Sequence, residues 1–238
     1  MDIQPTSQAG FSPPADQRPA VSVDVIIFSL DMAANDLKTL LVRRRNPPFT
    51  GMWAIPGGFL RYGEALDAAA RRKLQDETGV RDVYLEQLFT FGDPQRDPRG
   101  HILTVTYFSL VPSDLLDLQA GSDTTGAALH SVYAPPPLAF DHAEILAYAL
   151  QRLRYKLEYT AAGFELLPDE FTLSELQQAY EIVLAEKLDK RNFQRRIVES
   201  GILEETGQVR TGRKGPRPML YRYRQDAQTE IKARRLFP

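Results

Sequence analysis

The stretch GFLRYGEALDAAARRKLQDETGV, residues 58–80, decides the fold of the first part of this 238-residue chain. Gly79 marks the end of a helix, because glycine readily adopts the left-handed conformation found just after helix ends. Before it, four small or apolar residues recur at helical spacing and so share one face of the expected helix: Leu66, Ala69, Ala70 and Leu74. The opposite face is charged, which predicts a helix packed on a core along one side.

The same stretch resembles the Nudix box, whose pattern is G-x5-E-x7-R-E-U-x-E-E-x-G-U, with U an apolar residue. The residues that fit at the right spacing are Gly58, Glu64, Arg72, Leu74, Glu77, Gly79 and Val80. The preceding Trp53, Pro56 and Gly57 also suit this family. The resemblance implies a loop and helix whose carboxylates hold Mg²⁺ on a diphosphate while water attacks.

Two positions of the box depart from that pattern, because Lys73 replaces the first glutamate of its core and Asp76 replaces the second. Positions 73, 76 and 77 share a helical face, so the lysine changes their formal charge sum from −3 to −1. We expect weak or no binding of Mg²⁺, no required cofactor, and loss or severe reduction of hydrolysis, and we assign no catalytic residue. The Lys73 ammonium is expected to substitute for the metal, pairing with Asp76 or Glu77 and approaching the diphosphate. Alternatively, Lys73 points into solvent and the remaining acids still catalyse slowly.

A nucleotide effector is expected to contact the box and its surroundings. Arg96 and Arg99 in the loop FGDPQRDPRGH can each fork onto a phosphate beside Asp93 and Asp97, although a solvated charged loop explains them equally well. Trp53 suits stacking on a base, but as the sole tryptophan between apolar neighbours it is more often a core residue. The expected effector set is Trp53, Gly57, Gly58, Lys73, Glu77, Arg96 and Arg99. The three histidines (101, 130, 142) are interpreted as structural, and no metal ligand is assigned.

Alternating apolar patterns flank the box. Residues 21–30, 39–45, 83–91 and 101–112 read as strands, residues 113–139 as irregular, and residues 142–159 as a long amphipathic helix. This predicts an α/β (α+β) Nudix sandwich over residues 20–160. Residues 1–19 are too poor in large apolar side chains to offset the entropy of ordering, and are interpreted as a flexible tail.

Residues 161–226 predict a winged helix-turn-helix domain, followed by a C-terminal tail at 227–238. A capping box, Thr172 to Glu175, begins one helix, and KRNFQRRI at 190–197 forms the second, which in this motif enters the major groove. Two strands then flank a Gly, Pro and basic loop that has the composition of a wing suited to a minor groove. The expected DNA contacts are Thr172, Lys190, Arg191, Asn192, Gln194, Arg195, Arg196, Arg213, Lys214 and Arg217.

The charge is segregated along the chain. The formal net charge is only −2, but residues 187–224 hold 11 Lys or Arg against 4 Asp or Glu, a local +7 that leaves −9 elsewhere. A basic run is often just a solvated face, yet confinement of this excess to the second helix and the wing favours double-stranded DNA as a partner. Binding should therefore weaken strongly with salt.

Composition excludes several other classes. The chain has no cysteine, which removes disulfides, Cys-ligated zinc and thiol catalysis. No leader-like segment and no apolar run approaching about 18 residues is present. A cytoplasmic protein with no membrane partner is therefore expected.

The span from about residue 20 to 225 resembles the Nudix-related transcriptional regulators of NAD metabolism, the NrtR family. The segments that carry this resemblance are RDPRG (96–100), LAFDH (138–142), ILAYALQRLRYKLEYT (145–160), FTLSELQQAYEIVLAEKLDKRNFQRRI (171–197), GRKGPRP (212–218) and LYRYR (220–224). The resemblance implies a homodimeric repressor of NAD synthesis or salvage genes, bound to a pseudo-palindromic operator and displaced by ADP-ribose.

Three other functions remain open from the sequence. A regulator of this architecture can respond to a sugar or sugar phosphate instead of ADP-ribose. An active ADP-ribose pyrophosphatase, with a C-terminal domain that only contacts proteins, is disfavoured by Lys73. An RNA-cap or nucleotide hydrolase that grips RNA lacks the aromatic platform expected for stacking single-stranded bases.

Overall fold

A computed structural model describes residues 18–79, 84–112, 116, 124–159, 167–211 and 217–224. Val80, Arg213 and Lys214 lie outside the described residues, as do the C-terminal tail and all but the last two residues of the N-terminal tail. Among the described residues, no helix is both long enough and apolar enough to cross a bilayer.

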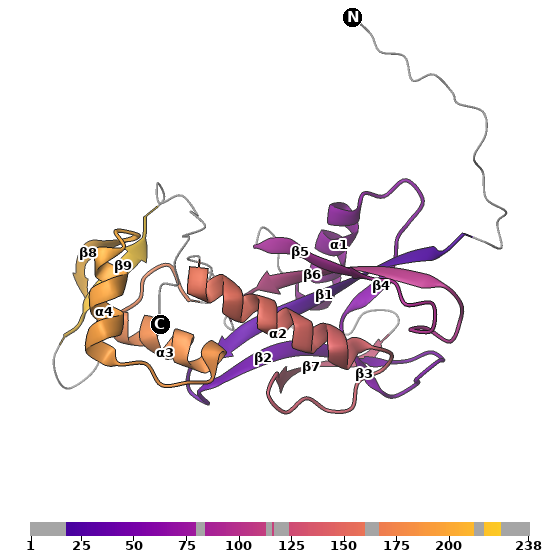
Figure 1. Ribbon diagram of the computed structural model, residues 1–238, viewed down its shortest axis with the longest axis horizontal. Helices are drawn as coiled ribbons and strands as arrows, with labels where there is room; N and C mark the ends of the chain where they lie inside the picture. The colour runs from indigo at the N-terminus through magenta and orange to yellow at the C-terminus, as the bar shows by residue number, and fades with distance from the viewer. Residues whose placement is uncertain are drawn as a thin grey trace, which may run out of the picture.

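A mixed seven-stranded sheet forms the centre of the first part of the chain (Figure 1). Its main path runs β3-β2-β1-β6-β5, with β4 paired to β1 and β7 paired to β2. β1 and β6 are parallel, and the other pairs are antiparallel. The strands are β1 (Ala20–Asp31), β2 (Asp36–Arg44), β3 (Trp53–Ala54), β4 (Gly57–Phe59), β5 (Leu85–Phe91), β6 (Ile102–Leu110) and β7 (Thr124–Ser131).

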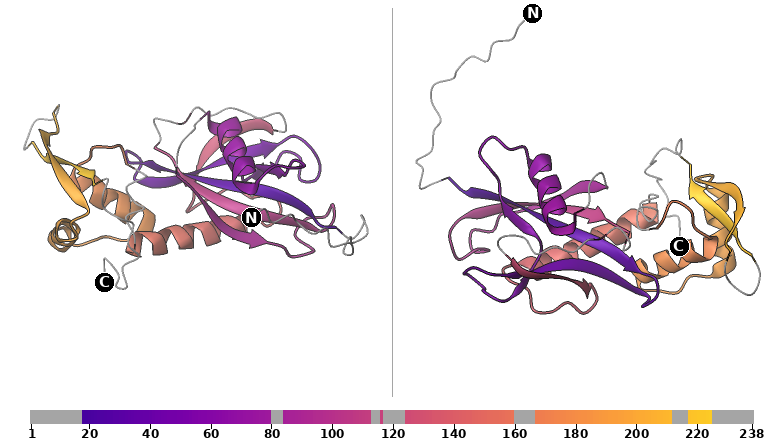
Figure 2. Two further views of the ribbon diagram at one scale, coloured as in Figure 1. Left: turned by 90° about the horizontal axis from the view of Figure 1, so that it is seen from above. Right: turned by 180° about the vertical axis from the view of Figure 1, so that it is seen from behind.

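One helix covers each face of this sheet (Figures 1 and 2). Successive β1 side chains point to opposite faces, so Val23, Val25 and Ile27 pack with α1 (Leu66–Thr78). The alternate residues Ile26, Phe28 and Leu30 belong instead to the cluster that contains α2 (His142–Tyr159). The predicted α/β sandwich is therefore confirmed.

The interpretation of residues 113–139 as irregular is wrong for part of that span. β7 lies within it and pairs with β2 over most of its length, from Lys38 opposite Ser131 to Arg43 opposite Gly126. The segment reads TTGAALHS, and its Gly and Ala residues have low strand propensity and give no alternating pattern. Pairing with β2 therefore outweighs the local preference.

The C-terminal part forms two helices followed by a hairpin, as the sequence predicts. The elements are α3 (Leu173–Leu184), α4 (Lys190–Glu199), β8 (Leu203–Val209) and β9 (Met219–Tyr223). The rings of Tyr180 and Phe193 meet edge to face at 5.3 Å, and together with Ile197 they join α3 to α4 in the core. Reciprocal backbone hydrogen bonds between Phe171 and Tyr221 hold the hairpin beside the start of α3. This is a winged helix-turn-helix.

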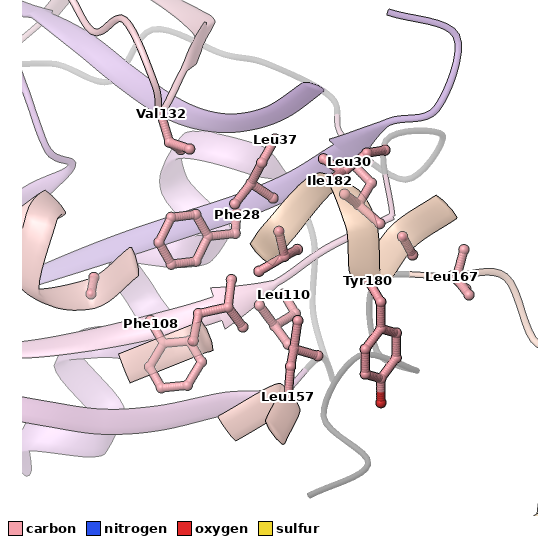
Figure 3. Packing of buried hydrophobic residues seen from close by; sticks show 14 of the residues in the cluster. Phe28, Leu30, Leu37, Phe108, Leu110, Val132, Leu157, Leu167, Tyr180 and Ile182 are labelled. Atoms are coloured by element: carbon pink, nitrogen blue, oxygen red, sulfur yellow. The ribbon is translucent and has the colours of Figure 1, made fainter. Parts of the chain in front are cut away.

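The two parts of the chain share one hydrophobic cluster (Figure 3). Leu30 and Leu110, from the ends of β1 and β6, lie with Leu157 of α2 in the same cluster as Tyr180 and Ile182 of α3. α3, the first helix of the helix-turn-helix, therefore packs against the end of the sheet and connects the rest of the C-terminal part to it (Figure 1).

Candidate effector pocket and nucleic-acid interface

A cleft of about 760 Å³ opens where β1, β4, α1 and the start of α2 meet. Residues that the sequence singled out in and beside the box and in the loop after β5 line it: Gly57, Gly58, Lys73, Asp76, Glu77, Gly79, Arg96, Asp97 and Arg99. Residues that the sequence did not place there also line it, among them Asp24, Arg44, Phe140 and His142. The cleft thus combines both signs of charge with an aromatic wall, which suits a ligand having phosphate, hydroxyl and ring groups.

Gly57 and Gly58, the first two residues of β4, allow neighbouring groups to lie close to the backbone. Because Gly57 pairs with Asp24 across β4 and β1, a Cβ added at Gly57 would lie 1.8 Å from Asp24 Oδ1 and 2.8 Å from the Val23 carbonyl oxygen. A Cβ at Gly58 would meet only Lys73, at 2.6 Å from its Cε. The backbone at Gly57 is therefore in close contact with buried groups, whereas Gly58 borders one flexible side chain.

Replacing Gly57 by alanine is expected to lower the free energy of unfolding by about 1–3 kcal/mol, because neither the Val23 backbone nor the buried Asp24 has room to move. Gly58→Ala is the matched control, since the flexible end of Lys73 can move aside. Guanidinium unfolding of both variants measures the difference. Equal stability of the two variants would contradict the close packing at Gly57.

Lys73 lies in the cleft with its side chain against Gly58 and is partly buried. Within the described residues, which include all three side chains, no ion pair joins Lys73 to Asp76 or Glu77. Asp76 instead approaches Arg72 at 3.9 Å, and Glu77 is buried. The expected pairing of Lys73 is therefore corrected, because its stem runs across to β4 instead of along its own helix.

Glu64 and Arg72, two further box residues, do not line the cleft. Arg72 donates to both carboxylate oxygens of Glu64, from Nε at 2.7 Å and from Nη2 at 2.9 Å, and the backbone N–H of Arg61 adds a third bond at 3.0 Å. The hydrogen bonds from Arg72 and Arg61 lower the pKa of Glu64 to about 2. This pair fastens the box loop to α1 and so holds the cleft wall.

Arg96 forms the inner end of the cleft. Its side chain is only 4 % exposed, and its guanidinium donates to both oxygens of Asp141, each at 2.7 Å. It also lies 4.0 Å from Asp24 Oδ2, which accepts a 2.7 Å bond from Thr104 Oγ1. Beside them, Nδ1 of buried His142 accepts the Ile55 N–H at 2.9 Å, and burial lowers the pKa of His142, so this imidazole is neutral. A buried polar network therefore backs the cleft.

Arg99 lies nearer the surface and is paired with Asp97, which it contacts from Nε at 3.0 Å and from Nη2 at 2.6 Å. Its guanidinium carbon is 5.3 Å from the centre of the Phe59 ring and 5.4 Å from that of Phe140. Arg44 approaches the Phe140 ring at 4.7 Å. Cations and aromatic faces thus alternate at this part of the cleft.

Trp53 is absent from the cleft lining. It contacts the ring of His130 at 4.5 Å and packs against the hydrophobic cluster shared with α2. Of the two interpretations given for this tryptophan, the structure favours the core one.

α4 presents a basic face. Lys190, Arg191 and Arg195 are exposed, while Phe193 and Ile197 are buried against α3. Asp189 caps the helix by accepting the Asn192 N–H at 2.8 Å. Partly exposed positions complete the set predicted on this helix: Asn192, Gln194 and Arg196. Arg217, before β9, is exposed as well.

Thr172 differs from the other residues predicted to contact DNA. It is 4 % exposed, its Oγ1 accepts the Glu175 N–H at 3.1 Å, and its own N–H donates to Glu175 Oε2 at 2.8 Å. Glu175 Oε2 also accepts a 2.6 Å bond from Arg210 at the base of the hairpin. Because the Thr172 hydroxyl is committed to this capping box, the structure assigns Thr172 to the start of α3 rather than to a DNA contact.

Comparisons with known proteins match both parts of the chain. The Nudix domain family model matches residues 18–149, and that of the NrtR DNA-binding winged helix domain matches residues 163–223. The ADPR responsive transcriptional repressor NtrR of Acinetobacter baylyi is 41% identical over 213 residues, covering 86% of this chain and 82% of the relative.

Two solved structures extend this similarity. Shewanella oneidensis NrtR, crystallised with a 27mer DNA, has a TM-score of 0.80 at 34% identity and covers 90% of this chain and 98% of its own. The Nudix domain of the same protein, crystallised with ADP ribose, has a TM-score of 0.54 at 35% identity over 61% of this chain and 95% of its own. With both domains matched and a relative similar over most of its length, this chain belongs to the NrtR family.

Proposed function

We propose that this protein is a DNA-binding transcriptional repressor that senses ADP-ribose through its Nudix cleft. The observation that carries the proposal is the exposed basic face of α4, on a fold that matches a DNA-bound relative along nearly its whole length. Arginine, asparagine and glutamine side chains suit base edges in the major groove, and lysine suits phosphates. The rest of the chain carries a formal net charge of −9, which disfavours DNA as its partner.

The cleft suits a nucleotide diphosphate by its chemistry. Arg96, Arg99 and Lys73 supply cations for phosphate oxygens, and Asp24 and Asp97 supply acceptors for ribose hydroxyls. The proposed effector site is Gly57, Gly58, Lys73, Glu77, Arg96 and Arg99 as predicted from the sequence, extended by Asp24 and Phe140. Trp53 is left out of the proposed effector site, because it packs against the hydrophobic core instead of lining the cleft.

The donor set of the cleft does not fit a divalent cation. Lys73 places an ammonium beside Gly58, and the box acid Asp76 is half exposed and directed toward Arg72. Among the described residues, no three acids or histidines are grouped as metal ligands. Mg²⁺ needs closely spaced oxygen ligands in nearly octahedral geometry. We therefore assign the cleft a binding role without hydrolysis.

The proposal extends to assembly and setting. A homodimer would place two α4 helices on the half-sites of a pseudo-palindromic operator, since half-site symmetry follows protein symmetry. Genes of NAD synthesis or salvage are the proposed targets, and the cytoplasm, where the chromosome is accessible, is the proposed location. ADP-ribose, a product of NAD breakdown, would then release the repressor and allow expression of the genes that replace NAD.

The test uses a labelled duplex from the region upstream of the protein's own gene. Fluorescence anisotropy should show tight binding that weakens as ADP-ribose is added, while NAD and ribose 5-phosphate have little effect. Release by the sugar phosphate alone would favour the sugar-responsive alternative. Binding that is insensitive to salt would contradict the phosphate contacts on which the DNA assignment depends.

A further inference from the structure

α2 connects the cleft to the helix-turn-helix. Its first residue, His142, lines the cleft, and Arg154, twelve residues further along, contacts α3. At 1.5 Å per residue these two positions are about 18 Å apart along one helix. Buried residues of α2 between them, such as Ile145, Ala149 and Leu153, pack in the cluster that also contains the α3 core residues. α2 is therefore a continuous, packed connection between the cleft and α3.

At the far end, two donors hold the last turn of α3. Arg154 Nε donates to the Val183 carbonyl at 2.9 Å, and the Tyr133 hydroxyl donates to the same carbonyl at 3.2 Å and to that of Ile182. Carbonyls in the last turn of a helix lack intrahelical partners, and a cation near them complements the helix dipole. We call Tyr133 and Arg154 the α3 clamp. The clamp joins the first part of the chain to α3, and α3 packs against α4.

At the cleft end, the residue just before α2 is in ionic contact with the pocket. The Asp141 backbone carbonyl accepts from the N–H groups of Glu144 and Ile145 at 2.9 and 3.1 Å, so Asp141 is fixed to the first turn of α2. Its carboxylate holds Arg96 in the two-pronged contact described above. A phosphate accepts a guanidinium in the same forked geometry. An anionic ligand in the cleft therefore competes with Asp141 for Arg96.

We propose that α2 transmits ligand binding to the DNA-binding domain, with the Arg96–Asp141 pair as its input and the α3 clamp as its output. Tyr133 and Arg154, neither of which lines the cleft, are then positioning residues. The inference rests on the proposed function, in which ADP-ribose weakens DNA binding. A ligand shifts an equilibrium only through contacts that differ between two states. The clamp supplies the hydrogen bonds through which the position of α3 depends on that of α2.

Tyr133→Phe and Arg154→Met test the clamp, because each removes a hydrogen-bond donor and keeps most of the side-chain volume. Tyr155→Phe and Arg152→Met make the same changes at exposed positions of α2 and serve as matched controls. Calorimetry measures ADP-ribose binding, and anisotropy measures DNA affinity without ADP-ribose and at saturation. The clamp variants should bind each partner alone within about twofold of the unmodified protein. The affinity for DNA without ADP-ribose, divided by that at saturation, should fall by about fivefold in each clamp variant, and the controls should keep the full ratio.

The possible outcomes separate the clamp from the proposed function. Clamp variants that retain the full ratio overturn the proposed transmission and leave the repressor assignment intact. Variants with weaker DNA binding but an unchanged ratio also overturn it, because they show a purely structural role. If the unmodified protein binds DNA and ADP-ribose but the two do not affect each other, the proposed function itself fails. Tyr133→Phe removes a single oxygen, so the test stands even if Arg154→Met fails to fold.

Discussion

Replacing Arg191 and Arg195 together by alanine should weaken operator binding by about 100-fold and leave the protein folded. Both side chains are exposed on α4, and the hydrogen bond from Arg195 Nη2 to Asn192 Oδ1, at 3.1 Å, is a weak surface contact. Each arginine contact to a base edge contributes about 1–3 kcal/mol of discrimination. The core of the domain rests on Phe193, Ile197 and Tyr180, which these substitutions leave in place.

The control for this double variant is Arg71→Ala with Arg152→Ala, which removes two exposed arginines from α1 and α2 and changes the net charge equally. Titrations of specific and scrambled duplexes at several salt concentrations distinguish the kinds of contact. Loss of a phosphate contact makes the negative slope of log K against log salt shallower by about 0.9. Loss of a base contact instead lowers the preference for the specific duplex over the scrambled one. Equal loss of affinity in the control would place the interface outside α4.

Helices whose ends and buried faces are set by nearby residues were predicted correctly from the sequence. α1 ends at Gly79, whose φ of +69° and bond to the Gln75 carbonyl match the expected stop. α2 matches its predicted range, residues 142–159. The capping box at Thr172 was also recognised, but its burial was not, because the hydroxyl is enclosed only once the hairpin lies against α3.

Sequence reasoning found the side of the cleft that is continuous in the chain and missed the opposite side. The box and the loop at 92–100 carry motifs that suggest ligand contacts, whereas Asp24 lies in an apolar strand, and Phe140 lies in LAFDH, which the sequence linked to the family but not to the cleft. Only the pairing of β1 with β4 brings Asp24 to the cleft. A signal was available, since a lone carboxylate within VSVDVIIF is costly to bury unless it has partners. Its partner Thr104 is eighty residues away along the chain, and no local pattern identifies such a pair.

Lys73→Glu combined with Asp76→Glu should convert this binding cleft into one that hydrolyses ADP-ribose in the presence of Mg²⁺. Position 73 faces Gly58 inside the cleft, next to buried Glu77, so the change places an acid where an ammonium now lies. The formal charge sum of positions 73, 76 and 77 falls from −1 to −3, and the longer side chain at 76 extends the reach of its carboxylate. Closely spaced carboxylates are the ligands that Mg²⁺ prefers.

Hydrolysis by this double variant should rise at least about 100-fold above that of the unmodified protein, since a bound metal stabilises developing charge by several kcal/mol. Phosphate release after a coupled phosphatase step measures it, because the phosphatase acts on the two monoester products and spares the diphosphate. Arg71→Glu makes the same charge change at an exposed position of α1 and should remain inactive with or without Mg²⁺. Rapid magnesium-dependent turnover by the unmodified protein would overturn the binding-only role of the cleft. A double variant that binds both ADP-ribose and Mg²⁺ yet stays inert would show that the charge at position 73 is not what prevents hydrolysis.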